Sequence, residues 1–255
     1  MKFLEYLGRI AISFVEQVGE IGIFLSSIIK WLFRRPFFFQ QLFKQMEFIG
    51  VKSTTVILLT GIFTGMVTAL QMHYGFRQFG AEALVGSTAT LSVTRELGPV
   101  LAALMVTARA GSAMTAEIGT MRVTEQIDAL TVMGVNPFQY IVIPRIIAAL
   151  LVMPMLTLVY DAVGMVGSWI VGVKILGINE SMFWYRITEY VHYKDIFTGM
   201  FKATFFGLII ATVGSYKGYS TTGGAEGVGR ATTYSVVISS VSILIADYIL
   251  TALMY

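Results

Sequence analysis

An arginine and a glutamate stand next to each other at positions 95 and 96, in the middle of a long apolar stretch. The 26 residues from 83 to 108 carry no other charge, and twelve uncharged residues lie on either side of the pair. An ionised side chain at the centre of a bilayer costs about 2.5–3.5 kcal/mol, so such residues usually serve a function. The pair predicts a polar spot in a cavity that receives a charged group of a substrate. The alternative is a structural ion-pair network inside a helix bundle.

The element that must carry this pair is a helix long enough to cross a membrane. Residues 83–108 would span ~39 Å as a helix, against a hydrocarbon core of about 30 Å. Adjacent helical residues point about 100° apart, so Arg95 and Glu96 each need a partner elsewhere. Pro99 has no backbone N–H, and Gly98–Pro99 therefore predicts a kink that frees carbonyl groups beside the charged pair.

The composition predicts an all-α, polytopic helical membrane protein with a single domain over residues 1–255. Only 13% of the 255 residues are charged and 56% are hydrophobic, with a mean hydropathy of +0.74. A soluble domain of this size carries about 25% charged residues. The net charge of +3, without any basic block, argues against nucleic acid as a partner. The absence of cysteine excludes disulfides and thiol chemistry.

Five apolar stretches are predicted to span the membrane, at residues 52–73, 84–108, 141–171, 196–215 and 232–254. With the N-terminus in the cytoplasm, twelve Lys and Arg residues fall on the cytoplasmic side and four outside. The positive-inside rule therefore predicts a cytoplasmic N-terminus and an outer C-terminus. Residues 1–45 are predicted to hold an interfacial amphipathic helix, residues 3–32, ahead of a bundle formed by residues 46–255.

Three further charges fall inside predicted spans. Lys202 and Asp247 lie at similar depth, roughly 9 and 12 Å from the outer edge at the helical rise. They are therefore predicted to form a structural ion pair, with a role in substrate binding as the alternative. Asp161 lies near the middle of the third span, and no role for it follows from the sequence.

The segment 109–140 is predicted to be cytoplasmic, with a short amphipathic helix at 122–133. The apolar face of that helix comprises Val123, Ile127, Leu130 and Met133. Two interpretations remain open: a helix tucked under the bundle, or a docking helix that fits a groove on a soluble partner.

The glycine-rich connection at 216–231 is predicted to be a flexible cytoplasmic turn. A phosphate-binding P-loop needs a Gly-Lys pair, and none occurs in this chain, so no motif for ATP hydrolysis is visible. The only histidines, His73 and His192, are isolated. Neither a catalytic residue nor a metal site is therefore predicted.

The block RELGPVLAALMVTARAGSAMTAEIGTMRVTEQIDALTVMGVNP, residues 95–137, resembles the signature of the MlaE-type ABC transporter permeases. These are membrane subunits of lipid-trafficking systems in Gram-negative envelopes and plastids. Two later blocks, GYSTTGGAEGVGRATTYSVV (218–237) and DYILTALMY (247–255), resemble the C-terminal part of the same family. The likeness covers most of the chain from about residue 40 onward.

The resemblance implies a multi-pass permease in the bacterial inner membrane that moves phospholipid between that membrane and a periplasmic MCE-domain protein. It also implies pairing with a second copy of the chain and with two cytoplasmic ATPase subunits. ATP and Mg²⁺ would bind those subunits, so no cofactor is expected on this chain.

The same resemblance assigns roles to individual residues. Arg95, Glu96 and Leu97 are expected to line the lipid cavity, with Phe76 and Phe79 as apolar contacts. Arg95 would pair with phosphate, while Glu96 would face an amine or hold the arginine. The residues expected to couple the chain to the ATPase are Arg122, Glu125, Gln126 and Asp128.

Three other functions fit parts of the sequence. An ion-coupled secondary transporter would use Glu96 or Asp161 as a proton site, but such proteins usually show internal repeats, and none is visible. An intramembrane lipid-modifying enzyme would use Glu96 as a base, yet no nucleophile or metal set accompanies it. A membrane scaffold would only anchor a ring of partner subunits.

Overall fold

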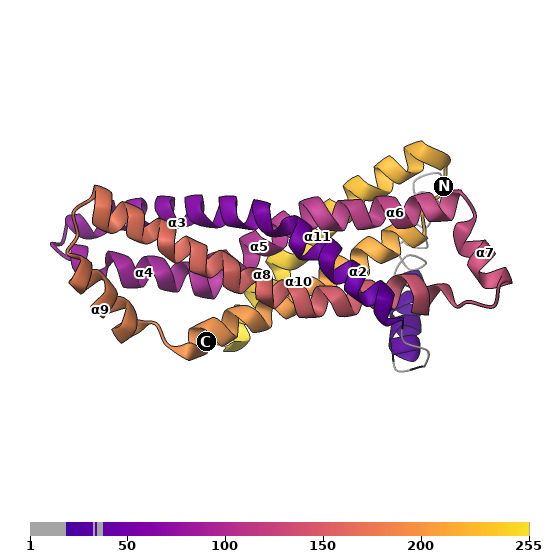
Figure 1. Cartoon of the computed structure of the whole chain (residues 1–255), viewed down its shortest axis with the longest axis horizontal. Coiled ribbons are helices and arrows are strands. Elements are labelled where there is room, and N and C mark those ends of the chain that lie inside the picture. Colours follow the sequence, from indigo (N-terminus) through magenta and orange to yellow (C-terminus); the bar gives the residue numbers. More distant parts are fainter. Residues whose placement is uncertain (1–18, 33, 35–37, 255) are drawn as a thin grey trace, which may run out of the picture.

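The computed structural model describes residues 19–32, 34 and 38–254, which form helices and short connections without a strand among them. Five helical segments in this part of the chain are long and apolar enough to span a membrane. They are Phe39–Arg77, Glu82–Val123, Phe138–Ile175, Tyr193–Tyr219 and Gly224–Met254. The prediction of a polytopic all-α protein with five spans is confirmed (Figure 1).

The first segment bends at Gly50, where α2 (Phe39–Ile49) meets a 3₁₀ turn (Val51–Ser53) and then α3 (Thr54–Arg77). The predicted division between residues 45 and 46 therefore falls inside α2. Arg109 fixes this joint, because its guanidinium donates to the carbonyl oxygen of Phe48 and, over 3.3 Å, to the hydroxyl of Ser53.

Residues 19–32 are helical and pack on the bundle near the end of α10 (Tyr193–Tyr219). The ring of Phe24 lies 5.3 Å from that of Phe138 and 5.4 Å from that of Tyr216. Ile21 and Leu25, on the apolar stripe of the predicted interfacial helix, stay exposed. The rest of that helix, residues 3–18, lies outside the described residues.

The second segment does not end at residue 108. It begins with a 3₁₀ turn (Glu82–Leu84) and then runs without a break as α4 (Val85–Ser92), a π-helical turn (Val93–Leu97), α5 (Gly98–Val106), a second π-helical turn (Thr107–Gly111) and α6 (Ser112–Val123). The helix therefore continues past the predicted span and into the segment 109–140. Thr115 shows why: its hydroxyl bonds Gly214 O and Ser235 Oγ, so α6 continues as a packing partner of two other helices.

The predicted helix at 122–133 is split. Arg122 and Val123 end α6, whereas α7 comprises Gln126–Val132 only. Glu125 between them takes the left-handed backbone conformation, with φ of 59°, which redirects the chain. In Figure 1, α7 projects at one end of the molecule, opposite the end occupied by α9.

The third segment comprises a π-helical turn (Phe138–Val142), α8 (Ile143–Trp169) and a final π-helical turn (Ile170–Ile175). Two connections differ from prediction. Residues 172–195 contain an additional helix, α9 (Glu180–Tyr190), and most of 216–231 is helical because α11 spans Gly224–Met254.

Glycines bring α3 and α8 into close contact. Gly61 and Gly65 lie on one face of α3, and a methyl group at Gly65 would overlap the backbone of Gly164. A methyl group at Gly167 would likewise overlap the backbone of Ile62. Small residues at i and i+4 allow helix backbones to approach closely in a membrane, where packing rather than hydrophobic burial drives association.

The helices differ in how far they extend. Figure 1 shows that α3, α4 and α8 continue to one end of the molecule, while the C-terminus and the start of α10 lie well short of it. α9 runs back from that end along α4 to the start of α10. The chain turns at Val191 and His192, both extended, so a break of two residues separates α9 from α10.

Candidate functional site

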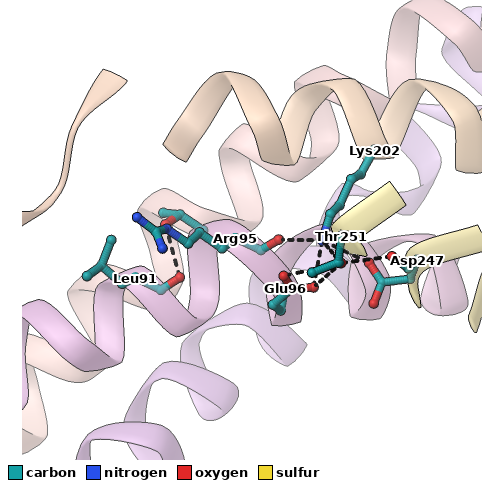
Figure 2. A network of polar contacts seen from close by, with 7 residues as sticks. Leu91, Arg95, Glu96, Lys202, Asp247 and Thr251 are labelled. Atoms are coloured by element: carbon teal, nitrogen blue, oxygen red, sulfur yellow. Dashed lines mark hydrogen bonds and ion pairs between the residues drawn. The ribbon is translucent and has the colours of Figure 1, made fainter. Parts of the chain in front are cut away.

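Lys202 lies at the centre of a cluster of polar side chains from α10, α11 and the second segment (Figure 2). Its ammonium group is fully buried and donates to Glu96 Oε2 at 2.6 Å and to Thr251 Oγ1 at 2.7 Å. A third bond, of 3.1 Å, goes to the carbonyl oxygen of Arg95. These bonds use all three N–H donors of the ammonium. Asp247 Oδ1, 3.1 Å away, is therefore an ion-pair partner that receives no hydrogen bond.

The local sequence explains why the carbonyl of Arg95 accepts from Lys202. Pro99 at the start of α5 supplies no N–H to the residue four positions earlier, which is Arg95. Gly199 lets α10 approach this turn, because a methyl group there would overlap the carbonyl oxygen of Thr94. Lys202, one turn further along α10, then donates to the carbonyl oxygen of Arg95, to which Pro99 cannot donate.

Arg95 pairs with a different residue. Its Nη2 lies 2.7 Å from Asp195 Oδ1, and its Nε donates to the same oxygen over 2.8 Å. The other oxygen of Asp195 accepts the backbone N–H of His192 at 2.9 Å and so caps α10. The break between α9 and α10 therefore places a buried carboxylate directly beside Arg95.

Arg95 and Glu96 also face an open hollow of about 310 Å³, which Leu91 and Ser92 complete. Their side chains stay 37% and 39% exposed, although both are ion-paired. The pair therefore belongs to an ion-pair network, as the second interpretation of the sequence predicts, and it also borders an open hollow.

The other residues assigned to the lipid cavity lie elsewhere. Leu97 packs against the main hydrophobic core. Phe76 is partly buried in a second core cluster with Ala69 and Val85, and Phe79 is 81% exposed beyond the end of α3. The structure does not bring Phe76 or Phe79 to the hollow beside Arg95.

Sequence reasoning brought Lys202 and Asp247 together but missed Asp195 and Thr251. Asp195 precedes Lys202 by seven residues, and Thr251 follows Asp247 by four, so each shares a helix face with its neighbour. This helical spacing could have indicated that Asp195 and Thr251 lie near the Lys202–Asp247 pair. The cluster contains two cationic and three carboxylate side chains, which leaves one negative charge in excess when all are ionised.

Asp161 lies on α8, next to the turn that carries Arg95 and Glu96. Its side chain is 6% exposed, and neither carboxyl oxygen has a hydrogen-bond partner among the described residues. It lies against Gly98, where a methyl group would overlap Oδ1. Asp161 is therefore packed against the turn that carries Arg95 and Glu96.

The residues assigned to coupling surround the break between α6 and α7. Arg122 Nη1 lies 2.8 Å from Asp128 Oδ1, and Gln126 donates to Thr124 over 3.0 Å. Ile127 is buried, whereas Val132 and Met133 are 88% and 68% exposed. Leu130 packs partly against the core, so only Ile127 and Leu130 of the predicted apolar face hold α7 to the bundle.

The described residues hold no group of three or more His, Asp or Glu side chains that could bind a metal ion.

The chain is similar to known membrane permeases. The profile of the family described as Permease MlaE matches residues 42–253. A probable ABC transporter permease protein of Rickettsia bellii is 43% identical over 98% of this chain and 96% of its own.

Two relatives from other lineages are also similar. The intermembrane phospholipid transport system permease protein MlaE of Haemophilus influenzae is 38% identical over 100% of this chain and 98% of its own length. The chloroplastic protein TRIGALACTOSYLDIACYLGLYCEROL 1 of Arabidopsis thaliana is 36% identical over 92% of this chain and 67% of its own.

Proposed function

This chain belongs to the MlaE permease family, and on that premise we propose that it is the membrane subunit of an ABC transporter that moves phospholipid. The substrate passes between the bacterial inner membrane and a periplasmic MCE-domain partner. The Haemophilus relative, named for intermembrane phospholipid transport, supports this substrate because it is similar over the whole chain.

The observation that carries the proposal is the half-exposed charged pair beside the hollow. A phospholipid headgroup has a phosphate and often an amine. Arg95 can turn part of its guanidinium toward the phosphate, and Glu96 can face the amine. The buried members, Lys202 and Asp195, hold the two exposed side chains in place.

The energy comes from elsewhere in the assembly. No P-loop occurs in the chain, so two cytoplasmic ATPase subunits bind ATP and Mg²⁺. They dock on α7 and the adjoining residues, and Val132 and Met133 offer exposed apolar side chains for that contact. Closure of the ATPase dimer pushes α7, which adjoins α6. α6 transmits the movement to the turn at Arg95, because α6 and that turn belong to one continuous helical segment.

A second copy of the chain encloses the hollow beside Arg95 and Glu96. α3, α4 and α8 extend beyond the ends of α10 and α11, so two copies would enclose a space above the charged cluster. The N-terminus lies in the cytoplasm and the C-terminus faces the periplasm, as the distribution of Lys and Arg supports.

Photo-crosslinking tests the proposal. A benzophenone amino acid at Ser92, which lines the hollow, should capture radiolabelled phospholipid from vesicles better than the same group at Leu244, which is 53% exposed on α11. Glu96→Gln should reduce capture at Ser92. Equal capture at both positions would contradict the proposal, and so would purification of the intact complex without an ATPase.

A further inference from the structure

A second hollow lies on the α7 side of the bundle, between α2, α6, α7 and α8. It has a volume of about 550 Å³. Its polar lining includes Gln41, Lys44, Gln45, Glu117, Gln126 and Arg145. Four elements that are separate in sequence thus contribute polar side chains to one chamber, which lies far from Arg95 and Glu96.

Two buried side chains in this lining have unused hydrogen-bonding capacity. Arg145 is 4% exposed and binds Glu117 Oε2 at 2.8 Å and Ile141 O, but its Nε has no partner among the described residues. Gln45 is 5% exposed, and its Oε1 likewise lacks a partner there. A buried polar atom without a partner costs free energy, so such atoms indicate a missing ligand or water. The Nε–H of Arg145 is a donor that suits an anion, whereas Oε1 of Gln45 is an acceptor that needs a water or another donor.

The charge of the chamber favours an anion. Glu117 neutralises Arg145, while Lys44 is exposed and has no ion-pair partner within the described part of the chain. One positive charge therefore remains, accompanied by the side-chain amides of Gln41 and Gln126. A phosphate oxygen accepts hydrogen bonds from such donors.

The position of α2 indicates where that phosphate comes from. Phe39 and Phe43 lie one turn apart on α2 and are 65% and 66% exposed. Lys44 lies between this aromatic ridge and the chamber side of the helix, where Gln41 and Gln45 are found. An amphipathic helix of this kind lies in the membrane interface, with aromatic residues among the acyl chains and a lysine at headgroup level.

From this arrangement we propose that the chamber binds the phosphate of a phospholipid headgroup from the cytoplasmic leaflet. The acyl chains lie along Phe39 and Phe43, and the phosphate bonds Lys44 and the chamber amides. Gln126 belongs to α7, so an occupied chamber bridges α2 and the proposed ATPase-docking segment. The inference rests on the proposed function for the orientation of the chain in the membrane.

Crosslinking from inside the chamber tests it. Thr120 lines the chamber and is exposed. The full-length complex, with a benzophenone amino acid at this position, is reconstituted in vesicles of phosphatidylethanolamine and phosphatidylglycerol that carry radiolabelled phosphatidylglycerol. We expect capture of the label, and Lys44→Gln should weaken it by about tenfold, as loss of one charge-assisted phosphate contact would. Lys52→Gln is the matched control, because Lys52 is also exposed but lies outside the chamber.

Each outcome has a distinct meaning. Absence of capture, or an equal effect of Lys44→Gln and Lys52→Gln, would overturn the inference. Competition by inorganic phosphate would also overturn it, because the site would then take a free anion. Capture at Ser92 without capture at Thr120 would remove this chamber and leave the proposed function intact. Capture at Thr120 alone would support the chamber and contradict the outer lipid site. Unchanged melting temperatures of the variants would exclude unfolding as the cause.

Discussion

The ammonium group of Lys202 lies 3.1 Å from the carbonyl oxygen of Arg95, at the turn where Pro99 provides no backbone N–H. A helix-breaking residue thus creates the acceptor that satisfies a buried cation on another helix. In a membrane, the backbone groups freed by a proline must find partners within the protein. The kink and the buried lysine therefore stabilise each other.

Removal of Lys202 alone should be strongly destabilising. Lys202→Met leaves Glu96 and Asp247 close together without a cation, and breaking a buried ion pair on one side costs about 3–5 kcal/mol. Adding Glu96→Gln and Asp247→Asn should recover most of that loss. The measurement is unfolding in mixed detergent micelles; a triple variant no more stable than Lys202→Met would contradict the ion-pair account.

Asp195 should be more sensitive to alanine than to asparagine. Asparagine keeps an acceptor for the His192 N–H and loses only the charge opposite Arg95, which is 37% exposed and can be hydrated. Alanine removes the cap as well, which costs about 0.5–2 kcal/mol more. Thermal melting of the two variants measures this order, and a reversed order would show that the cap contributes little.

Gly65 and Gly75 on α3 form a matched pair. Gly65→Ala should destabilise the protein by about 1–3 kcal/mol, because the new methyl group overlaps the backbone of Gly164 on α8. Gly75 has open space around it, so Gly75→Ala should be neutral or should stabilise the helix by up to about 1 kcal/mol. Comparable losses at the two positions in detergent unfolding would rule out the close α3–α8 contact as the cause.

Gly98→Ala should be coupled to Asp161. The methyl group would overlap Asp161 Oδ1, so the single variant should lose about 1–3 kcal/mol. Asp161→Ala removes that overlap, and the double variant should be more stable than the sum of the single effects indicates. A double-mutant cycle by thermal melting gives the coupling, and strict additivity would show that the clash lies elsewhere.

Two substitutions of Glu125 test whether its side chain contributes to docking of the ATPase. Glu125→Gly relieves the left-handed conformation, worth about 1 kcal/mol, and removes the side chain. Both Glu125→Gly and Glu125→Lys should reduce co-purification of the ATPase. Glu226→Lys is the control, as an 84% exposed charge reversal at the start of α11. Retention of the ATPase by both Glu125 variants would argue against a docking role for this side chain.

Much of the architecture was predictable because membrane helices are constrained by length. Each of the five apolar stretches predicted as a span lies within one of the five long helical segments. The ends were less predictable, since a helix that leaves the bilayer continues when another helix can pack against it. α6 continues on Thr115 and its partners in this way, and α9 forms in a segment that reads as a connection.

The sequence by itself determined that charges fall inside predicted spans, that Arg95 and Glu96 point in different directions on a helix, and that Lys202 and Asp247 lie at similar depth. Only the tertiary structure decided which carboxylate each cation meets, because partner choice depends on how helices rotate and approach at glycine contacts. The same packing left Arg95 and Glu96 more than a third exposed at one hollow and placed Lys44, Arg145 and Gln45 around another. The hollow beside Arg95 is lined by residues 91–96 of one helical segment, whereas the second hollow forms only where α2, α6, α7 and α8 meet.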